Sequence, residues 1–130
     1  MITSPPFVNL VVIRSEDIDR AVTFYEAIGL TFQKHSHGSG PEHYASEKAG
    51  FVFEIYPLSP KQQSTVWTRL GFSVGDVDAL VARLAKDGAK IVSSPTDSEW
   101  GRRAVVKDLD GHAVELVEPN KREQAAAPNP

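Results

Sequence analysis

The chain has 130 residues, of which 41% are hydrophobic and 24% are charged, so it suits one globular domain with a single ordinary core. Its formal net charge of −3 excludes the basic stripe of a nucleic-acid binder, and its lack of cysteine excludes disulfides, thiolate metal sites and cysteine nucleophiles. No apolar run approaches the roughly 18 residues of a membrane span and no signal-peptide pattern is present, so a soluble, cytoplasmic protein without a membrane partner is expected.

The first half of the chain predicts one helix among four strands. A lead-in over residues 1–6 ends in two prolines. Apolar or β-branched runs then predict strands over residues 7–13, 30–35, 44–48 and 51–56. Asp17 stands where an N-cap belongs, and Gly29 stands where the helix must stop. Ala49-Gly50 predicts a hairpin between the last two strands.

The second half predicts the same order of elements after a linker over residues 58–65. Strands are expected over residues 66–74, 89–92, 103–108 and 112–117. A helix begins after Asp76 and ends at Gly88, and a polar loop containing Trp100 is expected over residues 93–101. Asp110-Gly111 predicts a two-residue hairpin. Residues 120–130 have too little apolar surface to order themselves and are expected to form a disordered tail.

The two halves repeat one supersecondary unit. The helical stripe of residues 17–25, apolar at i, i+3, i+4 and i+7, recurs over residues 76–84. Each half therefore predicts a βαβββ module, at about residues 7–57 and 66–119. We expect an α+β fold in which a pseudo-twofold relates the two modules within one domain over residues 7–119.

Strand alternation assigns a set of side chains to the sheet faces away from the helices, which are expected to be concave. These side chains are Val8, Leu10, Val12, Arg14, Val52, Glu54, Tyr56, Trp67, Arg69, Gly71, Ala113, Glu115 and Val117. Glu54 and Glu115 stand in apolar strands, where an unpaired carboxylate is costly. Arg69 is the expected partner because a guanidinium donates two parallel hydrogen bonds, and Arg14 is a second candidate at the rim. The alternative is that both glutamates lie on a solvated face.

Two segments carry a family likeness. They are the helix segment 17–25 followed by Gly29-Leu30, and the run from Lys107 to Leu116 with its Asp-Gly turn and its glutamate. They resemble the vicinal oxygen chelate superfamily of glyoxalases, bleomycin-resistance proteins and extradiol dioxygenases, over residues 7–119. The resemblance implies sheets curved around a central cup, and a homodimer. The superfamily includes isomerases, lyases, dioxygenases, thiol transferases and drug binders, so the likeness is specific for fold rather than for function.

In the metal-dependent members, a divalent ion takes ligands from the first, fourth, fifth and eighth strands. The resemblance places Leu10, Glu54, Arg69 and Glu115 at these positions. The two glutamates match, but Leu10 has no lone pair and the charge of Arg69 repels a divalent ion. No metal or other cofactor is therefore expected. The alternative is a divalent metal, with His43 or Asn9 turned into the cup.

The four histidines are interpreted as structural or solvated residues. His43 precedes the third strand and is interpreted as a loop residue with an ordinary role. His35 and His37 lie in a Gly/Ser-rich loop, where a His-x-His pair could bind metal but solvated side chains are favoured. His112 follows the Asp-Gly turn and is expected to be exposed.

The leading functional hypothesis is a glyoxalase- and bleomycin-resistance-like protein that binds a small molecule in a metal-free cup. The expected ligand-binding residues are Val12, Arg14, Glu54, Tyr56, Trp67, Arg69, Trp100 and Glu115. The second hypothesis is an enzyme, either a metal-dependent lyase, isomerase or dioxygenase, or a metal-free catalyst. In the metal-free version Glu54 or Glu115 is the catalytic base and Arg69 steadies an oxyanion. The third is an interaction or structural domain in which the aromatic residues serve as ordinary packing.

Overall fold

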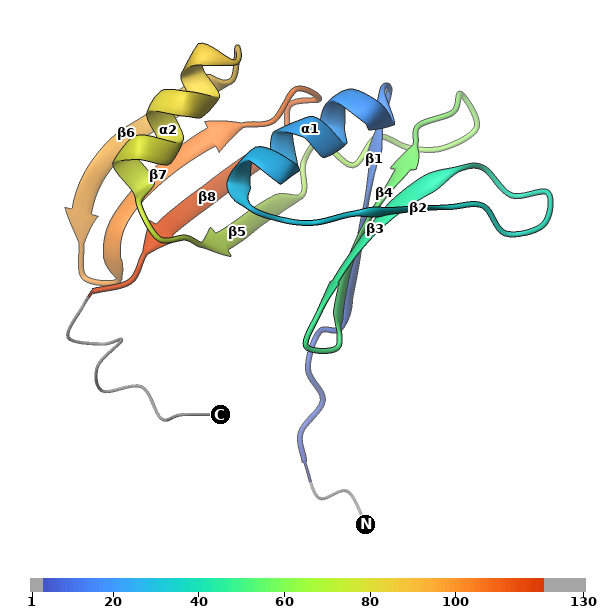
Figure 1. Ribbon diagram of the computed structural model, residues 1–130, viewed down its shortest axis with the longest axis horizontal. Helices are drawn as coiled ribbons and strands as arrows, with labels where there is room; N and C mark the ends of the chain where they lie inside the picture. Colours follow the sequence, from blue (N-terminus) through green and yellow to red (C-terminus); the bar gives the residue numbers. More distant parts are fainter. Residues whose placement is uncertain (1–3, 121–130) are drawn as a thin grey trace. The chain divides into compact units, whose positions relative to one another are not determined.

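The computed structural model describes residues 4–120, and the chain divides into two compact units, Met1–Ser64 and Thr65–Pro130. Among the described residues each unit holds one helix and one four-stranded sheet (Figure 1). The first unit contains β1 (Leu10–Ser15), α1 (Ile18–Ile28), β2 (Gln33–His35), β3 (His43–Lys48) and β4 (Phe51–Pro57). The second contains β5 (Arg69–Ser73), α2 (Val77–Lys86), β6 (Lys90–Ser98), β7 (Gly101–Lys107) and β8 (Ala113–Glu118).

This element order confirms the predicted α+β class and the tandem βαβββ modules. The predicted single domain and the central cup stay predictions. The predicted tail lies outside the described residues except for Asn120, and residues 1–3 of the predicted lead-in lie outside them as well.

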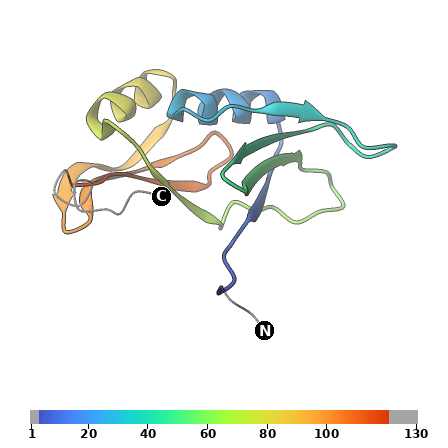
Figure 2. The same cartoon turned by 60° about the horizontal axis from the view of Figure 1, so that its bottom comes forward.

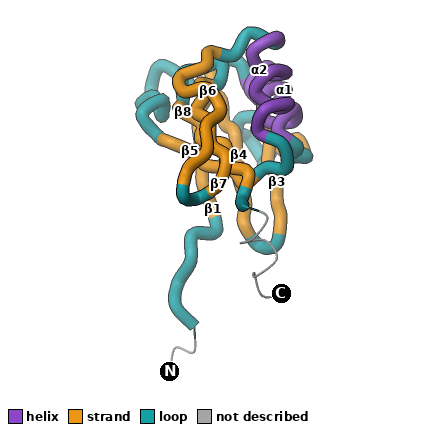
Figure 3. Tube along the Cα trace, turned by 90° about the vertical axis from the view of Figure 1, so that its left-hand side faces the viewer, coloured by secondary structure: helices purple, strands orange, loops and turns teal. Residues whose placement is uncertain are grey.

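Each sheet has a parallel pair at one edge. The strand orders are β1-β4-β3-β2 and β5-β8-β7-β6. β1 runs parallel to β4 and β5 runs parallel to β8, whereas the other neighbours are antiparallel. In each unit the helix crosses from the first strand at one edge of the sheet to the second strand at the other edge, and it lies against one face of its own sheet (Figure 2 and Figure 3). We call the opposite side of each sheet its open face.

Both helices begin where the repeat predicts. The Asp17 carboxylate accepts a hydrogen bond from the backbone N–H of Arg20 at 3.1 Å, and the Asp76 carboxylate accepts the equivalent bond from Ala79 at 3.0 Å. α1 ends at Gly29, whose φ of 125° lies in the region that favours glycine. Neither helix of the described chain has the length and apolar character that a membrane crossing requires.

The apolar stripe of each helix meets the covered face of its sheet. The core residues from the helices are Ala21, Val22, Phe24, Tyr25, Val77, Val81 and Leu84. The Tyr25 ring packs edge-on against Phe53 of β4, with ring centres 5.0 Å apart. This packing holds the covered face together and leaves the open face to its own side chains.

The predicted polar loop over residues 93–101 is wrong. β6 extends from Lys90 to Ser98, and only Glu99 and Trp100 form the turn to β7. The strand escapes a pattern-based prediction because it is an edge strand, where serines and Pro95 are tolerated, and because its pairing with β7 shifts register on either side of Ser93.

The turn between β7 and β8 also differs from the predicted two-residue hairpin, because it spans Asp108 to His112. One oxygen of Asp108, Oδ1, accepts hydrogen bonds from the backbone N–H groups of Asp110, Gly111 and His112. The other, Oδ2, lies 2.8 Å from His112 Nδ1, and His112 Nε2 lies 2.7 Å from the Thr65 hydroxyl. His112 is 0% exposed, so its predicted exposure is wrong.

Gly101 provides a test of this architecture. Its φ is 129°, and a Cβ there would clash with the carbonyl oxygen of Glu118 and lie 3.1 Å from Pro119 Cα. We expect Gly101→Ala to lower the free energy of unfolding by about 3 kcal/mol, because both backbone strain and overlap are added. The matched control is Gly71→Ala, where a Cβ meets open space at an ordinary φ. Equal midpoints in urea unfolding for the two variants would contradict the β7–β8 geometry.

Candidate functional site

The open face of the first sheet brings together most of the residues that strand alternation predicts there. The register pairs Leu10 with Val52, Val12 with Glu54 and Arg14 with Tyr56. Ile13, the residue between Val12 and Arg14, is fully buried on the covered face. The predicted facing of β1 and β4 is therefore correct.

A row of stacked side chains crosses this face at one end of the sheet. The Arg14 guanidinium lies 5.4 Å from the Tyr56 ring centre and donates a hydrogen bond to the Pro57 carbonyl at 3.1 Å. The ring of His43 stacks on Tyr56 with centres 4.1 Å apart and planes inclined by 7°. His43 opens β3 and is 2% exposed, so its interpretation as a loop residue is wrong.

The partner of Glu54 is His43 of β3, not the predicted arginine. His43 Nε2 lies 3.7 Å from Glu54 Oε2, and the glutamate side chain is 20% exposed. The other ring nitrogen of His43, Nδ1, lies 3.2 Å from the Pro41 carbonyl oxygen. The sequence places His43 next to the third strand but does not reveal this contact, because it depends on the β3–β4 register.

The open face of the second sheet holds a carboxylate between two guanidinium groups. Arg69 Nη2 donates to Glu115 Oε2 at 3.2 Å, which confirms the predicted pair. Arg103 Nε donates to Glu115 Oε1 at 2.7 Å, and sequence reasoning missed this second partner. The strand predicted over residues 103–108 was the available signal, because Arg103 shares a face with Val105, and Val105 is the register partner of Glu115.

The two arginines favour the ionised form of the Glu115 carboxyl. The hydrogen bond from Arg103, followed by that from Arg69, lowers the pKa of the Glu115 carboxyl, although partial burial opposes the shift. The same contact raises the pKa of Arg103. Two fixed positive charges thus surround one negative charge, and Arg69 is 53% exposed. The cluster carries a net positive charge and keeps guanidinium donors facing solvent.

The two tryptophans of the predicted ligand set lie outside the strands of the second unit. Trp67 precedes β5 and is 95% exposed. Trp100 lies in the β6–β7 turn and is also exposed. Val105, opposite Glu115, is five residues further along β7, a distance of roughly 17 Å in an extended strand. The structure therefore does not bring Trp100 and Glu115 together within this unit.

Comparison with known proteins decides the family. A sequence model of the Glyoxalase/Bleomycin resistance protein/Dioxygenase superfamily matches residues 8–116. The chain belongs to this superfamily. The predicted family resemblance is thus confirmed, and the glyoxalase superfamily fold agrees with the two βαβββ modules described above.

The relatives of this chain within the glyoxalase superfamily carry names that refer to different functions. An uncharacterized protein of Mycolicibacterium smegmatis is 30% identical over 115 residues, 88% of this chain and 96% of that protein. Lactoylglutathione lyase GLX1 of Arabidopsis thaliana is 30% identical over 125 residues, 83% of this chain and 42% of the lyase, so the chain spans less than half the plant protein. The structure of TnmS3, an antibiotic binding protein from Streptomyces sp. CB03234, has the same fold, with a TM-score of 0.73 and 24% identity over 92% of this chain and 100% of that chain.

The residues at the superfamily's metal-ligand positions do not fit a divalent ion. Leu10 has no donor atom. Arg69 is a cation whose guanidinium already binds Glu115, and Arg103 engages the other oxygen of that carboxylate. A metal at Glu115 would have to displace one guanidinium and remain beside the other, which electrostatic repulsion opposes.

The Glu115 cluster predicts a pH-dependent contribution to stability. Because folding lowers the pKa of the Glu115 carboxyl, its stabilisation is present above the ordinary glutamate pKa of about 4.3 and is lost as the pH falls below it. We expect Glu115→Gln to lower the free energy of unfolding by about 1 kcal/mol at pH 7 and by much less at pH 3.

Urea unfolding at a series of pH values measures this difference. Glu99→Gln, at the exposed turn before Trp100, is the matched control. The prediction is contradicted if wild type and Glu115→Gln differ by the same free energy of unfolding at pH 7 and at pH 3. The paired carboxylate would then not cause the pH dependence of stability.

Proposed function

We propose that this chain binds a small molecule through open-face residues of its sheets, without a metal ion shared by the four positions Leu10, Glu54, Arg69 and Glu115. The observation that carries the proposal is the Glu115 cluster, in which guanidinium groups occupy both carboxylate oxygens. A cationic group at this position supplies the charge that a divalent ion supplies in metal-dependent relatives. The antibiotic binding protein TnmS3, which has the same fold, supports the general kind of function.

Each open face, taken by itself, offers different chemistry for binding. The first offers a flat π surface, where Tyr56 and His43 stack and Arg14 lies beside them, together with the apolar Val12. The second offers the exposed donors of Arg69 next to Glu115. Apolar or aromatic walls with a few fixed polar groups are typical of small-molecule sites. Val12, Arg14, Glu54, Tyr56, Arg69 and Glu115 are the proposed ligand contacts, and Trp67 and Trp100 stay in the set as predictions.

Binding without metal can be tested with the two compounds that the superfamily names suggest. We expect bleomycin or lactoylglutathione to bind the full chain in excess EDTA, measured by isothermal titration calorimetry. Arg69→Ala should weaken binding by about tenfold, as expected for loss of one charge-assisted hydrogen bond. Arg83→Ala, on the exposed side of α2, is the matched control. Failure of both compounds to bind, or binding only after a divalent metal is restored, would contradict the proposal.

The alternative function is a metal-dependent lyase, isomerase or dioxygenase, and two observations favour it. Glu54 and Glu115 match the superfamily's carboxylate ligands, and the chain is 30% identical to part of a lactoylglutathione lyase. Turnover of a lactoylglutathione precursor or a catechol that requires added metal and disappears in Glu115→Gln would support this alternative. A homodimer is a further proposal, for which light scattering of the purified chain is the test.

A further inference from the structure

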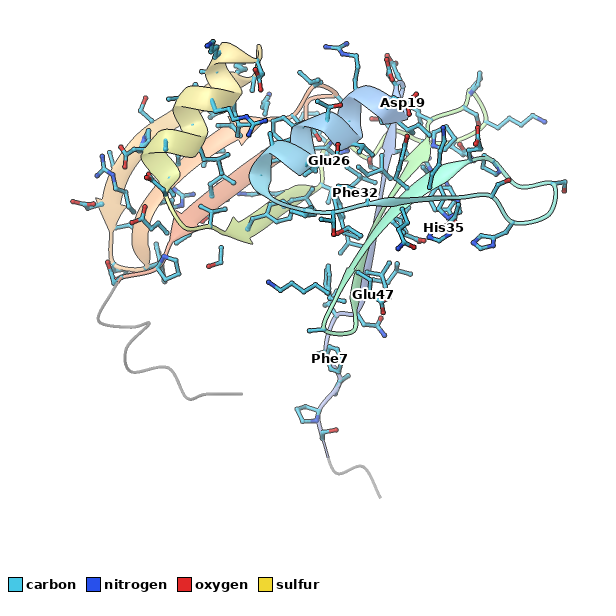
Figure 4. The ribbon with its side chains drawn as sticks, in the orientation of Figure 1. Phe7, Asp19, Glu26, Phe32, His35 and Glu47 are labelled. Atoms are coloured by element: carbon cyan, nitrogen blue, oxygen red, sulfur yellow. The ribbon has the colours of Figure 1, made fainter. Side chains whose placement is uncertain are left out.

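Three histidines gather at one end of the first sheet. His35 ends β2 and is the register partner of His43, the first residue of β3. His37 follows two residues after His35, in the loop that leads to β3; Figure 4 shows His35 where β2 gives way to this loop. The ring centres are 5.8 Å apart for His35 and His37, 5.9 Å for His35 and His43, and 5.4 Å for His37 and His43.

The local backbone explains why the rings meet. Cross-strand partners place their side chains on the same face, and residues two apart in an extended strand share a face. A tight turn then reverses the chain after His37, closed by the Gly40 N–H donating to the His37 carbonyl at 2.9 Å. Gly38 has a φ of 58°, which favours glycine there. The proposed function does not use His35 or His37.

We propose that His35, His37 and His43 bind a divalent transition metal of the zinc class, with Glu54 as the fourth ligand. Imidazoles that share one tetrahedral zinc have ring centres roughly 5 Å apart. The three observed separations, 5.4 to 5.9 Å, are slightly larger, and the donor atoms of the four residues do not yet lie within 4.8 Å of one another. Imidazole nitrogen is a preferred donor for zinc, copper and nickel. Because the His35 and His37 rings are stacked with planes inclined by 10°, they must rotate for their nitrogens to converge.

His43 is already arranged as a ligand. Its Nδ1, 3.2 Å from the Pro41 carbonyl, carries the proton that this oxygen accepts, which leaves the lone pair on Nε2. Nε2 faces Glu54 Oε2 at 3.7 Å, too long for a hydrogen bond and near the roughly 3.3 Å between two ligand atoms of one zinc. The stack on Tyr56 holds the ring in place. A hydrogen bond from a ligand histidine to a backbone carbonyl is the usual arrangement in metal sites.

The charges around the cluster are compatible with a cation. Lys34 alternates to the other face, where its ammonium lies 3.8 Å from Glu42 and 4.0 Å from Asp19. Arg14 is separated from His43 by one strand, because it is the register partner of Tyr56 on β4. The site lies within the first unit and shares only Glu54 with the superfamily's ligand positions, so it goes beyond the proposed function.

The test is binding of Zn²⁺ and Co²⁺ by the untagged full chain after treatment with EDTA and dialysis. We expect one equivalent of Zn²⁺ by calorimetry, and a visible d–d absorption band typical of tetrahedral cobalt. His37→Ala and His35→Ala should each weaken Zn²⁺ binding by about tenfold or more, since each removes one ligand. Ser39→Ala in the same loop and Glu115→Gln in the second unit are the controls and should bind as wild type does.

Three outcomes would overturn the metal site. They are no binding of either ion by wild type, binding that both histidine variants retain in full, and binding that Glu115→Gln abolishes. The last outcome would assign the ion to the superfamily's ligand positions and would contradict the proposed function as well. If the histidines bind no metal, bleomycin or lactoylglutathione can still bind the chain in EDTA. The two proposals can therefore be refuted separately.

Discussion

The parallel pairing of β1 with β4, and of β5 with β8, sets the layout of both units. Parallel neighbours cannot be joined by a tight turn, so the chain leaves the sheet between them and its crossover helix covers one face. Tyr25 and Leu84 are almost fully buried on that face. Among the described residues, the opposite face has no helix of its own unit against it. Both candidate glutamates stand there.

The two glutamates meet the same electrostatic requirement with different partners. Glu115 lies between two guanidinium groups, which cannot be deprotonated in a protein, so its surroundings stay cationic. Glu54 lies beside His43, whose Nε2 is 3.7 Å from the carboxylate oxygen Oε2. A cation is therefore repelled on the second open face, whereas the first offers it an acid and imidazole nitrogens. The same fold thus presents two glutamates with different partners on its two open faces.

The sequence predicts what depends on local pattern. The caps at Asp17 and Asp76, the hairpin at Ala49-Gly50 and the Arg69–Glu115 pair all follow from short-range spacing or strand alternation. The hairpin is tight because Ala49 and Gly50 both have positive φ, at 53° and 84°. The caps and the hairpin need no knowledge of how distant segments pair, whereas the Arg69–Glu115 pair was found because strand alternation places both side chains on one face.

What the sequence does not reveal depends on register or on loop conformation. His112 is polar and follows an Asp-Gly turn, yet it is buried because Asp108 gathers three backbone N–H groups and one ring nitrogen in a five-residue loop. The contacts of His43 with His35, Glu54 and Tyr56 require the pairings of β3 with both of its neighbours.

In each unit, packing restricts the residues of the covered face more than those of the open face. This difference explains how two copies of one unit can carry different open-face residues. A covered-face residue such as Ile13 or Val114 is completely buried, so a change there alters packing and is costly. Open-face residues such as Glu115 are paired with neighbours in the same sheet. At corresponding places the first strand carries Leu10 and the fifth carries Arg69, and both sheets keep the same strand order. The chemistry of each unit is therefore read from its open face, and the fold that the superfamily shares does not determine it.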